Sequence, residues 1–142
     1  MVRMFRPGMW VGLLLGIAFP AMAQESTAPR IELRENTPNP FFPSTTITFE
    51  IHREVCNRGH QPVVTLRVYN VLVQVVAAPT LKDSTGQRLE NVRLRCGSYL
   101  AYWDGKARDG HEVPDGVYYY QLVVDGERVS TRKMIVRRGG EH

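Results

Sequence analysis

Hydrophobic and polar residues alternate with a period of two in several short segments of this chain. The clearest are Thr45–His52 and Val63–Tyr69. Because successive side chains of a β-strand point to opposite faces, this pattern predicts strands with one buried face. The residues expected to point inward are Ile47, Phe49 and Ile51 in the first segment and Val64, Leu66 and Val68 in the second.

Further apolar segments lie between turn-forming residues and are also predicted to be extended. Val117–Val124 gives the strongest signal, because nearly all of its residues are β-branched or aromatic. Asp125 and Gly126 then form a hairpin signal, whereas Gly97 and Ser98 are expected to break the chain between two strands. The other segments are Ile31–Leu33, Val71–Ala77, Leu89–Cys96, Tyr99–Trp103 and Arg128–Val136.

These segments, with few helical patterns among them, define the expected fold class. Turn signals separate them at short intervals, as is typical of all-β domains. We therefore predict a single immunoglobulin-like β-sandwich of about seven antiparallel strands. It is expected to span residues 36–138, after a flexible lead-in at 24–35 and before a loose tail at 139–142.

The N-terminal residues have the pattern of a secretory signal. Arg3 and Arg6 precede the apolar run Met9–Phe19, and Ala21–Ala23 is a small-x-small cleavage site. This predicts a cleaved signal peptide over residues 1–23. A membrane anchor is the alternative, but a spanning helix needs about 20 apolar residues. We expect export to the periplasm, cell surface or medium, with no transmembrane segment in the mature chain.

Export changes the net charge of the working protein and the redox environment of its cysteines. The formal net charge is +4, but Arg3 and Arg6 leave with the signal. No concentrated basic stripe of the kind that binds nucleic acid remains. Cys56 and Cys96 are the only cysteines, and an even count in an oxidising compartment predicts a disulfide. A metal pair or two free thiols are the alternatives.

A proline-rich segment, Asn36–Ser44, reads NTPNPFFPS. Its prolines exclude helix and favour extended or turn backbone. Phe41 and Phe42 are expected to cap an open end of the sandwich.

A second turn-rich segment, Trp103–Tyr120, reads WDGKARDGHEVPDGVYYY. Trp103 shares a strand face with Tyr99 and Ala101, so it is expected to anchor the core. Two turns are predicted, one at Asp104 and Gly105 and one ending at Gly116. Tyr118, Tyr119 and Tyr120 alternate between faces, so at least one is expected to be exposed.

Four segments together resemble a known family. Asn36–Phe49, Val64–Val76, Trp103–Tyr120 and Thr131–Val136 are similar, in this order, to the type IX secretion C-terminal sorting domain. They are also similar to the immunoglobulin-like domain of the flagellar hook-capping protein. The resemblance implies the sandwich fold. In a sorting domain, Lys133, Arg137 and Arg138 would supply charge for contact with the export machine.

The chain departs from the family pattern at several places. Val73 stands where the family usually has a glycine in a tight turn, so this turn is expected to be rearranged or to continue as strand. Cys56 and Cys96 are additions to the pattern. Only Gln24–Glu35 lie between the signal and the sandwich, whereas a sorting domain normally follows a large passenger, and this favours a free-standing module.

No catalytic constellation stands out in the sequence. The four histidines (His52, His60, His111 and His142) are expected at the surface, and no serine lies in a nucleophile elbow. Asp104, Asp109 and Asp115 form a possible calcium loop, but their spacing fits turn formation better. We therefore expect no enzyme activity, cofactor, metal or small-molecule substrate.

The sequence therefore favours a secreted, non-enzymatic module that works by protein–protein contact at the cell surface or in an extracellular assembly. The alternative is a type IX-like sorting domain that an outer-membrane export machine recognises.

Overall fold

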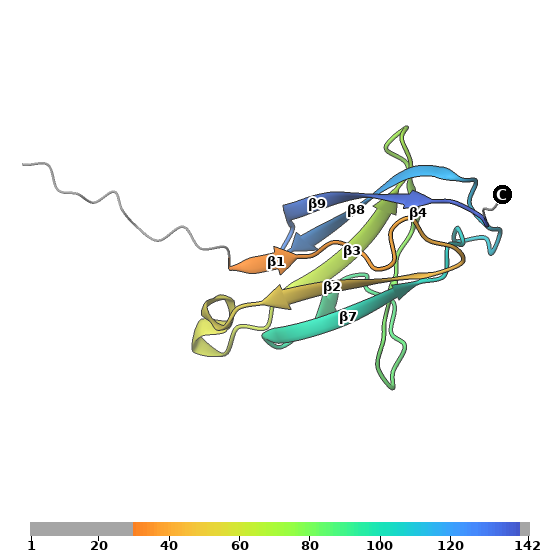
Figure 1. The fold of residues 1–142 in the computed structure, drawn as a ribbon. Coiled ribbons are helices and arrows are strands. Elements are labelled where there is room, and N and C mark those ends of the chain that lie inside the picture. The colour runs from red at the N-terminus through yellow and green to blue at the C-terminus, as the bar shows by residue number, and fades with distance from the viewer. Residues whose placement is uncertain (1–29, 140–142) are drawn as a thin grey trace, which may run out of the picture.

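The computed structural model describes residues 30–139, so the expected signal peptide and all but the first residue of the tail lie outside the described residues. Two antiparallel sheets, of four and five strands, pack face to face (Figure 1). This confirms the predicted all-β sandwich. The described part has nine strands rather than about seven, and several of them are only two or three residues long.

The first sheet has the strand order β1-β2-β7-β5. Its long members are β2 (Thr45–Ile51) and β7 (Gly97–Trp103), which pair along their whole length. The short strands β1 (Ile31–Leu33) and β5 (Thr80–Leu81) form its edges. Residues 31–33 were expected to belong to a flexible lead-in and also to form a short edge strand. The structure has the edge strand, so the sheet begins before residue 36.

The second sheet has the order β4-β3-β8-β9, and a short strand, β6, also pairs with β3. Its members are β3 (Val63–Tyr69), β4 (Val75–Ala77), β6 (Val92–Arg93), β8 (Gly116–Val124) and β9 (Glu127–Val136). Strands β8 and β9 form a hairpin around Asp125 and Gly126, as the turn signal predicts.

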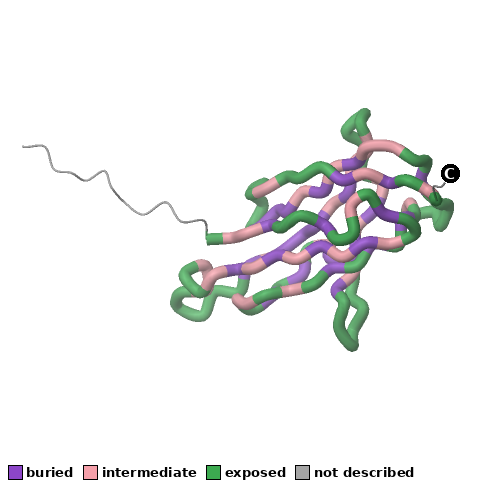
Figure 2. The backbone as a smooth tube through the Cα atoms, in the orientation of Figure 1, coloured by how far each residue is buried: buried purple, intermediate pink, exposed green. Residues whose placement is uncertain are grey.

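The core fills the space between the two sheets, where the buried stretches of the tube face each other (Figure 2). The inward residues predicted for β2 and β3 are all buried. Tyr118 and Tyr120 also point inward, whereas Tyr119 is half-buried on the outer face. Burying these apolar side chains is the main favourable term in folding.

One edge of the sandwich is closed by hydrogen bonds from the second sheet to the backbone at the end of β1. The Tyr120 hydroxyl donates to the Arg34 carbonyl at 2.6 Å, and Arg132 Nε donates to the Leu33 carbonyl at 2.6 Å. Burial raises the pKa of Tyr120 to about 12. The phenol therefore stays protonated and remains a donor across the physiological pH range.

The structure differs from the prediction in the region before and at the start of β7. Within Leu89–Cys96 only Val92–Arg93 is a strand. The backbone of Leu89 is divided between two partners, because its N–H donates to the Pro79 carbonyl and its carbonyl accepts from the Leu66 N–H. This segment crosses between the sheets, and its apolar residues are buried without a continuous ladder. Gly97 and Ser98, expected to break the chain, instead begin β7.

The Cys56–Cys96 disulfide is present and joins the short 3-10 segment η2 (Arg53–Gly59) to the loop before β7. It fits the oxidising compartment that export implies. Across residues 30–139, no helix has the length and apolar character needed to cross a membrane.

Replacing both Cys56 and Cys96 by serine is expected to lower the free energy of unfolding by about 4 kcal/mol, because the bond closes a loop with a sequence separation of 40 residues. Urea melts of the two proteins measure the difference. A loss below about 1 kcal/mol would show that the cross-link does not constrain the unfolded chain.

Candidate functional site

The two turn-rich motifs meet at one end of the sandwich, around Trp103. The indole is buried between two aromatic rings in edge-on contacts, with centroid distances of 5.6 Å to Phe41 and 6.0 Å to Tyr118. Its Nε1 donates to the Lys106 carbonyl at 2.9 Å. Burial raises the pKa of the Tyr118 hydroxyl, which donates to the Pro114 carbonyl at 2.8 Å. Trp103 is thus a core anchor, as expected.

Gly105 lies against the other motif. A Cβ atom there would be 2.5 Å from the Pro43 carbonyl oxygen, and the backbone φ is +75°. The lack of space and the left-handed conformation both disfavour a side chain at this position. The close approach locks the turn after β7 onto the proline-rich segment, which lies about sixty residues earlier in the sequence.

The acidic residues of this loop each bond a different partner. Asp104 accepts from the Lys106 N–H at 3.0 Å, and Asp109 accepts from the His111 N–H at 3.0 Å. These contacts to His111 lower the pKa of Asp109. Asp115 pairs with Arg138 at 2.6 Å. Asp104 and Asp109 thus bond the backbone two residues on, as turn-forming aspartates do, whereas Asp115 holds the segment after β9.

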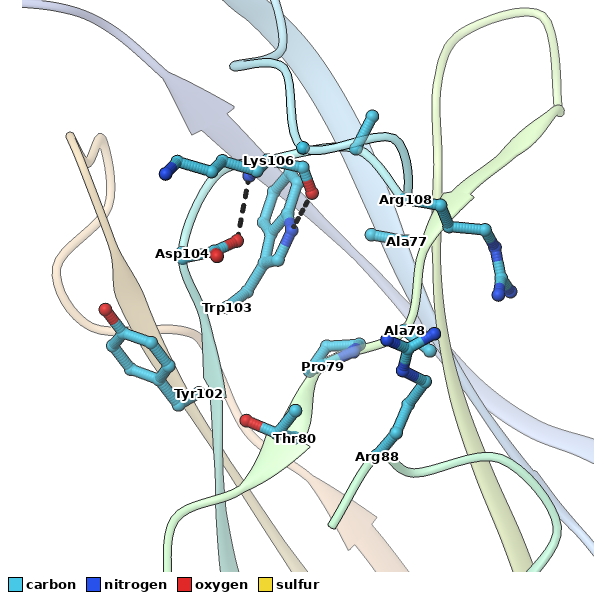
Figure 3. A pocket seen from close by; sticks show the side chains of 12 residues that line it. Ala77, Ala78, Pro79, Thr80, Arg88, Tyr102, Trp103, Asp104, Lys106 and Arg108 are labelled. Carbon is cyan, nitrogen blue, oxygen red and sulfur yellow. Dashed lines mark hydrogen bonds between the residues drawn. The ribbon is translucent and has the colours of Figure 1, made fainter. Parts of the chain in front are cut away.

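A cavity of about 270 Å³ opens beside Trp103 (Figure 3). Arg88, Lys106 and Arg108 lie around it, and the only carboxylate among its lining residues is Asp104. Arg108 is paired with Glu90 at 2.6 Å. Thr80 and Tyr102 also line the cavity, and its lining residues include no histidine, cysteine or serine.

The most exposed apolar residues of the described chain lie next to this end of the sandwich, on the turn between β3 and β4. Val71, Leu72 and Val73 are 62%, 72% and 74% exposed. The predicted extended segment Val71–Ala77 is therefore wrong over its first half, since only Val75–Ala77 is strand. We call residues 71–73 the apolar tip.

Asn70 holds the apolar tip in place. Its Oδ1 accepts from the N–H groups of Leu72 and Gln74 at 3.0 and 2.9 Å, and its Nδ2 donates to Gln74 Oε1 at 2.8 Å. The Val73 N–H donates to the Asn70 carbonyl at 3.0 Å. These bonds within the turn present the three apolar side chains to solvent in a defined conformation.

Val73 adopts a left-handed conformation, with φ +62°. A hairpin loop of this kind favours glycine at its left-handed position, and a β-branched residue there is strained. A turn is present, so the expectation that the chain continues as strand here is wrong, and the left-handed Val73 costs about 1–3 kcal/mol.

The basic residues near the C-terminus have different environments. The Arg138 guanidinium lies 4.8 Å above the Phe42 ring and also bonds Glu112 and the Val113 carbonyl. Phe42 is 39% exposed, so only Phe41 caps the interior. Lys133 and Arg137 are exposed. Arg138 thus binds the chain end to the motif loops.

One group of polar side chains was not anticipated from the sequence. Glu32, Glu50 and His52 come together on the outer face of the first sheet, with ligand atoms within 4.8 Å of one another. In the sequence, the only indication of this group is that Glu50 and His52 are two residues apart, which places both on one face of a strand. The partner on β1 depends on strand pairing, which local sequence does not specify.

No protein-family model matches the chain, and no curated protein matches it. Solved structures that align with this chain include the following two. Pseudomonas fluorescens alkylpurine DNA glycosylase AlkC, bound to DNA containing an abasic site analog, aligns over 77% of this chain and 31% of its own, with 13% identity and a TM-score of 0.46. A conjugate transposon protein from Bacteroides vulgatus aligns over 87% of this chain and 96% of its own, with 16% identity and a TM-score of 0.45. This chain thus spans less than a third of the glycosylase. At these scores neither likeness bears on function.

Gly105→Ala is expected to lower the free energy of unfolding by about 2–4 kcal/mol, because the added methyl group meets the Pro43 carbonyl. The matched control is Gly110→Ala, where φ is +91° and no atom lies within 4 Å. It isolates the backbone cost of about 1 kcal/mol. Equal losses in denaturant melts would contradict the role of the close approach.

Val73→Asn is expected to raise the free energy of unfolding by about 1 kcal/mol, since asparagine tolerates the left-handed region. Val71→Asn serves as the control, because Val71 is also largely exposed (62%, against 74% for Val73) and has no positive φ. Thermal melts compare the two variants with the parent. A destabilised Val73→Asn protein would show that the turn is not strained.

Proposed function

We propose that this protein is an exported, non-enzymatic β-sandwich that works by protein–protein contact at the cell surface or in an extracellular assembly. The observation that carries the proposal is the apolar tip, in which three successive hydrophobic side chains are more than 60% exposed. Contiguous exposed apolar surface marks interaction sites in folded proteins.

The surface beside the apolar tip is hollowed and can accommodate a protruding side chain of a partner. An open hollow of about 410 Å³ lies between the tip and the loop after β7. Its lining is apolar at Val71, Leu72, Val76, Ala107, Val113, Pro114 and Tyr118, and polar at Asn70, Asp109, His111 and Glu112. A projecting apolar group next to an apolar hollow is the arrangement found at the centre of many protein interfaces.

The conformation of the tip also favours binding. Four hydrogen bonds in which Asn70 is donor or acceptor fix the turn before any partner arrives, so little conformational entropy is lost on association. The strain at Val73 is retained where glycine would remove it. A valine side chain adds apolar contact area, which offsets that cost in a complex but not in the free protein.

The resemblance to sorting domains keeps export-machine recognition as the alternative function. In that case Lys133 and Arg137, which are exposed, are the basic residues available for contact.

A photo-crosslinking amino acid at position 72, in cells that make the protein naturally, tests the proposal. We expect one protein adduct of defined mass from Leu72. The control position is Ser84, exposed in the loop after β5. Val73→Asp in the probe-bearing protein is expected to reduce the adduct at least about tenfold, because a buried unpaired charge opposes association.

The outcomes separate the two functions. An adduct with a structural or surface protein supports the assembly role. An adduct confined to an outer-membrane export component supports sorting in its place. Equal labelling from Leu72 and Ser84, or an adduct with lipid alone, overturns the proposal of a protein-binding tip.

A further inference from the structure

A compact set of metal-ligating side chains lies on the outer face of the first sheet, near η2. Glu32 on β1 and Glu50 on β2 are directly opposite each other in the antiparallel register. His52 follows β2 and reaches the same two carboxylates. The group therefore combines two carboxylates and an imidazole from two paired segments.

The distances fit a single ion. His52 Nε2 lies 3.3 Å from Glu32 Oε2 and 3.9 Å from Glu50 Oε1, and all three ligand atoms lie within 4.8 Å of one another. Two ligands bound to zinc at about 2.1 Å and a tetrahedral angle are about 3.4 Å apart. Small side-chain rotations are sufficient to reach this geometry.

The cluster already attracts positive charge. Glutamates directly opposite each other in a sheet repel, and here Arg34 lies between them. Its guanidinium is 2.9 Å from Glu32 Oε1 and 3.3 Å from Glu50 Oε1. The Arg34 side chain is 53% exposed, and exposed ion pairs of this kind contribute about 0–1 kcal/mol. An ion that binds more tightly can therefore displace it.

The backbone around the cluster is held in place by bonds on both sides. The His52 N–H donates to the Arg30 carbonyl at 2.8 Å, and the Arg34 N–H donates to the Thr48 carbonyl at 2.9 Å. The His52 carbonyl accepts from the Val55 N–H, shortly before the disulfide at Cys56. An open cavity of about 430 Å³ beside Glu50 and His52 leaves room for a water ligand.

We propose that Glu32, Glu50 and His52 bind a divalent ion of the zinc class, with water in the fourth position and Arg34 as a displaceable competitor. The imidazole selects against calcium and magnesium, which prefer oxygen ligands alone. Zinc accepts this mixed set of nitrogen and oxygen donors. The site is independent of the apolar tip and adds a binding function at a different place on the molecule.

Titration of zinc chloride into the purified protein by calorimetry tests the site. The protein carries its disulfide and no histidine tag. We expect one ion per chain and a melting temperature that rises with zinc concentration. His52→Ala and Glu50→Gln are each expected to weaken zinc binding at least about tenfold. Arg34→Gln is expected to tighten it several-fold, because it removes the competing cation.

His60→Ala and His111→Ala are the matched controls, since each of these histidines contacts a single carboxylate, Asp125 or Asp109. Their zinc affinity is expected to equal that of the parent. Circular dichroism checks the fold of each variant, and Glu50→Gln keeps the side-chain shape if His52→Ala does not fold. Absence of binding at millimolar zinc, unchanged affinity in Glu50→Gln, or weaker binding in Arg34→Gln overturns the proposal.

Discussion

The packing of Trp103 between Phe41 and Tyr118 joins segments that lie far apart in the sequence. The indole fills one end of the space between the sheets. The backbone beside it approaches so closely that Gly105 has no room for a Cβ atom against Pro43. The loop after β7 and the proline-rich segment are therefore fixed relative to each other.

The segment between β1 and β2 connects both sheets, which is why its polar contacts matter as much as its apolar ones. Its backbone accepts the hydroxyl of Tyr120 and the guanidinium of Arg132 near its start. Near its end, Phe41 pairs with β9 through two backbone hydrogen bonds. The segment thus ties the edges of the two sheets together on one side of the sandwich, where otherwise both would be left without partners.

The two proposed binding regions differ in their local source of unfavourable energy, which is backbone strain in one and charge repulsion in the other. The apolar tip is held in an unfavourable conformation at Val73, and its turn is maintained by the side chain of Asn70. The Glu32, Glu50 and His52 group is unstrained but carries a like-charge pair that Arg34 neutralises. In both places a binding partner would relieve or exploit a cost that the folded protein already carries.

The sequence by itself determined the strands with clear alternation, because a period of two is a local property of the backbone. β2 and β3 bury the residues predicted for them, and the hairpin at Asp125 and Gly126 follows from its own turn chemistry. The disulfide followed from cysteine count and compartment. Only the tertiary structure decided where apolar runs are not strands. Leu89 is buried by partners on two sides, and Val71–Val73 stay exposed because Asn70 closes a turn there. The pairing of Glu32 with Glu50 is equally non-local, since it depends on which strands become neighbours and in which register.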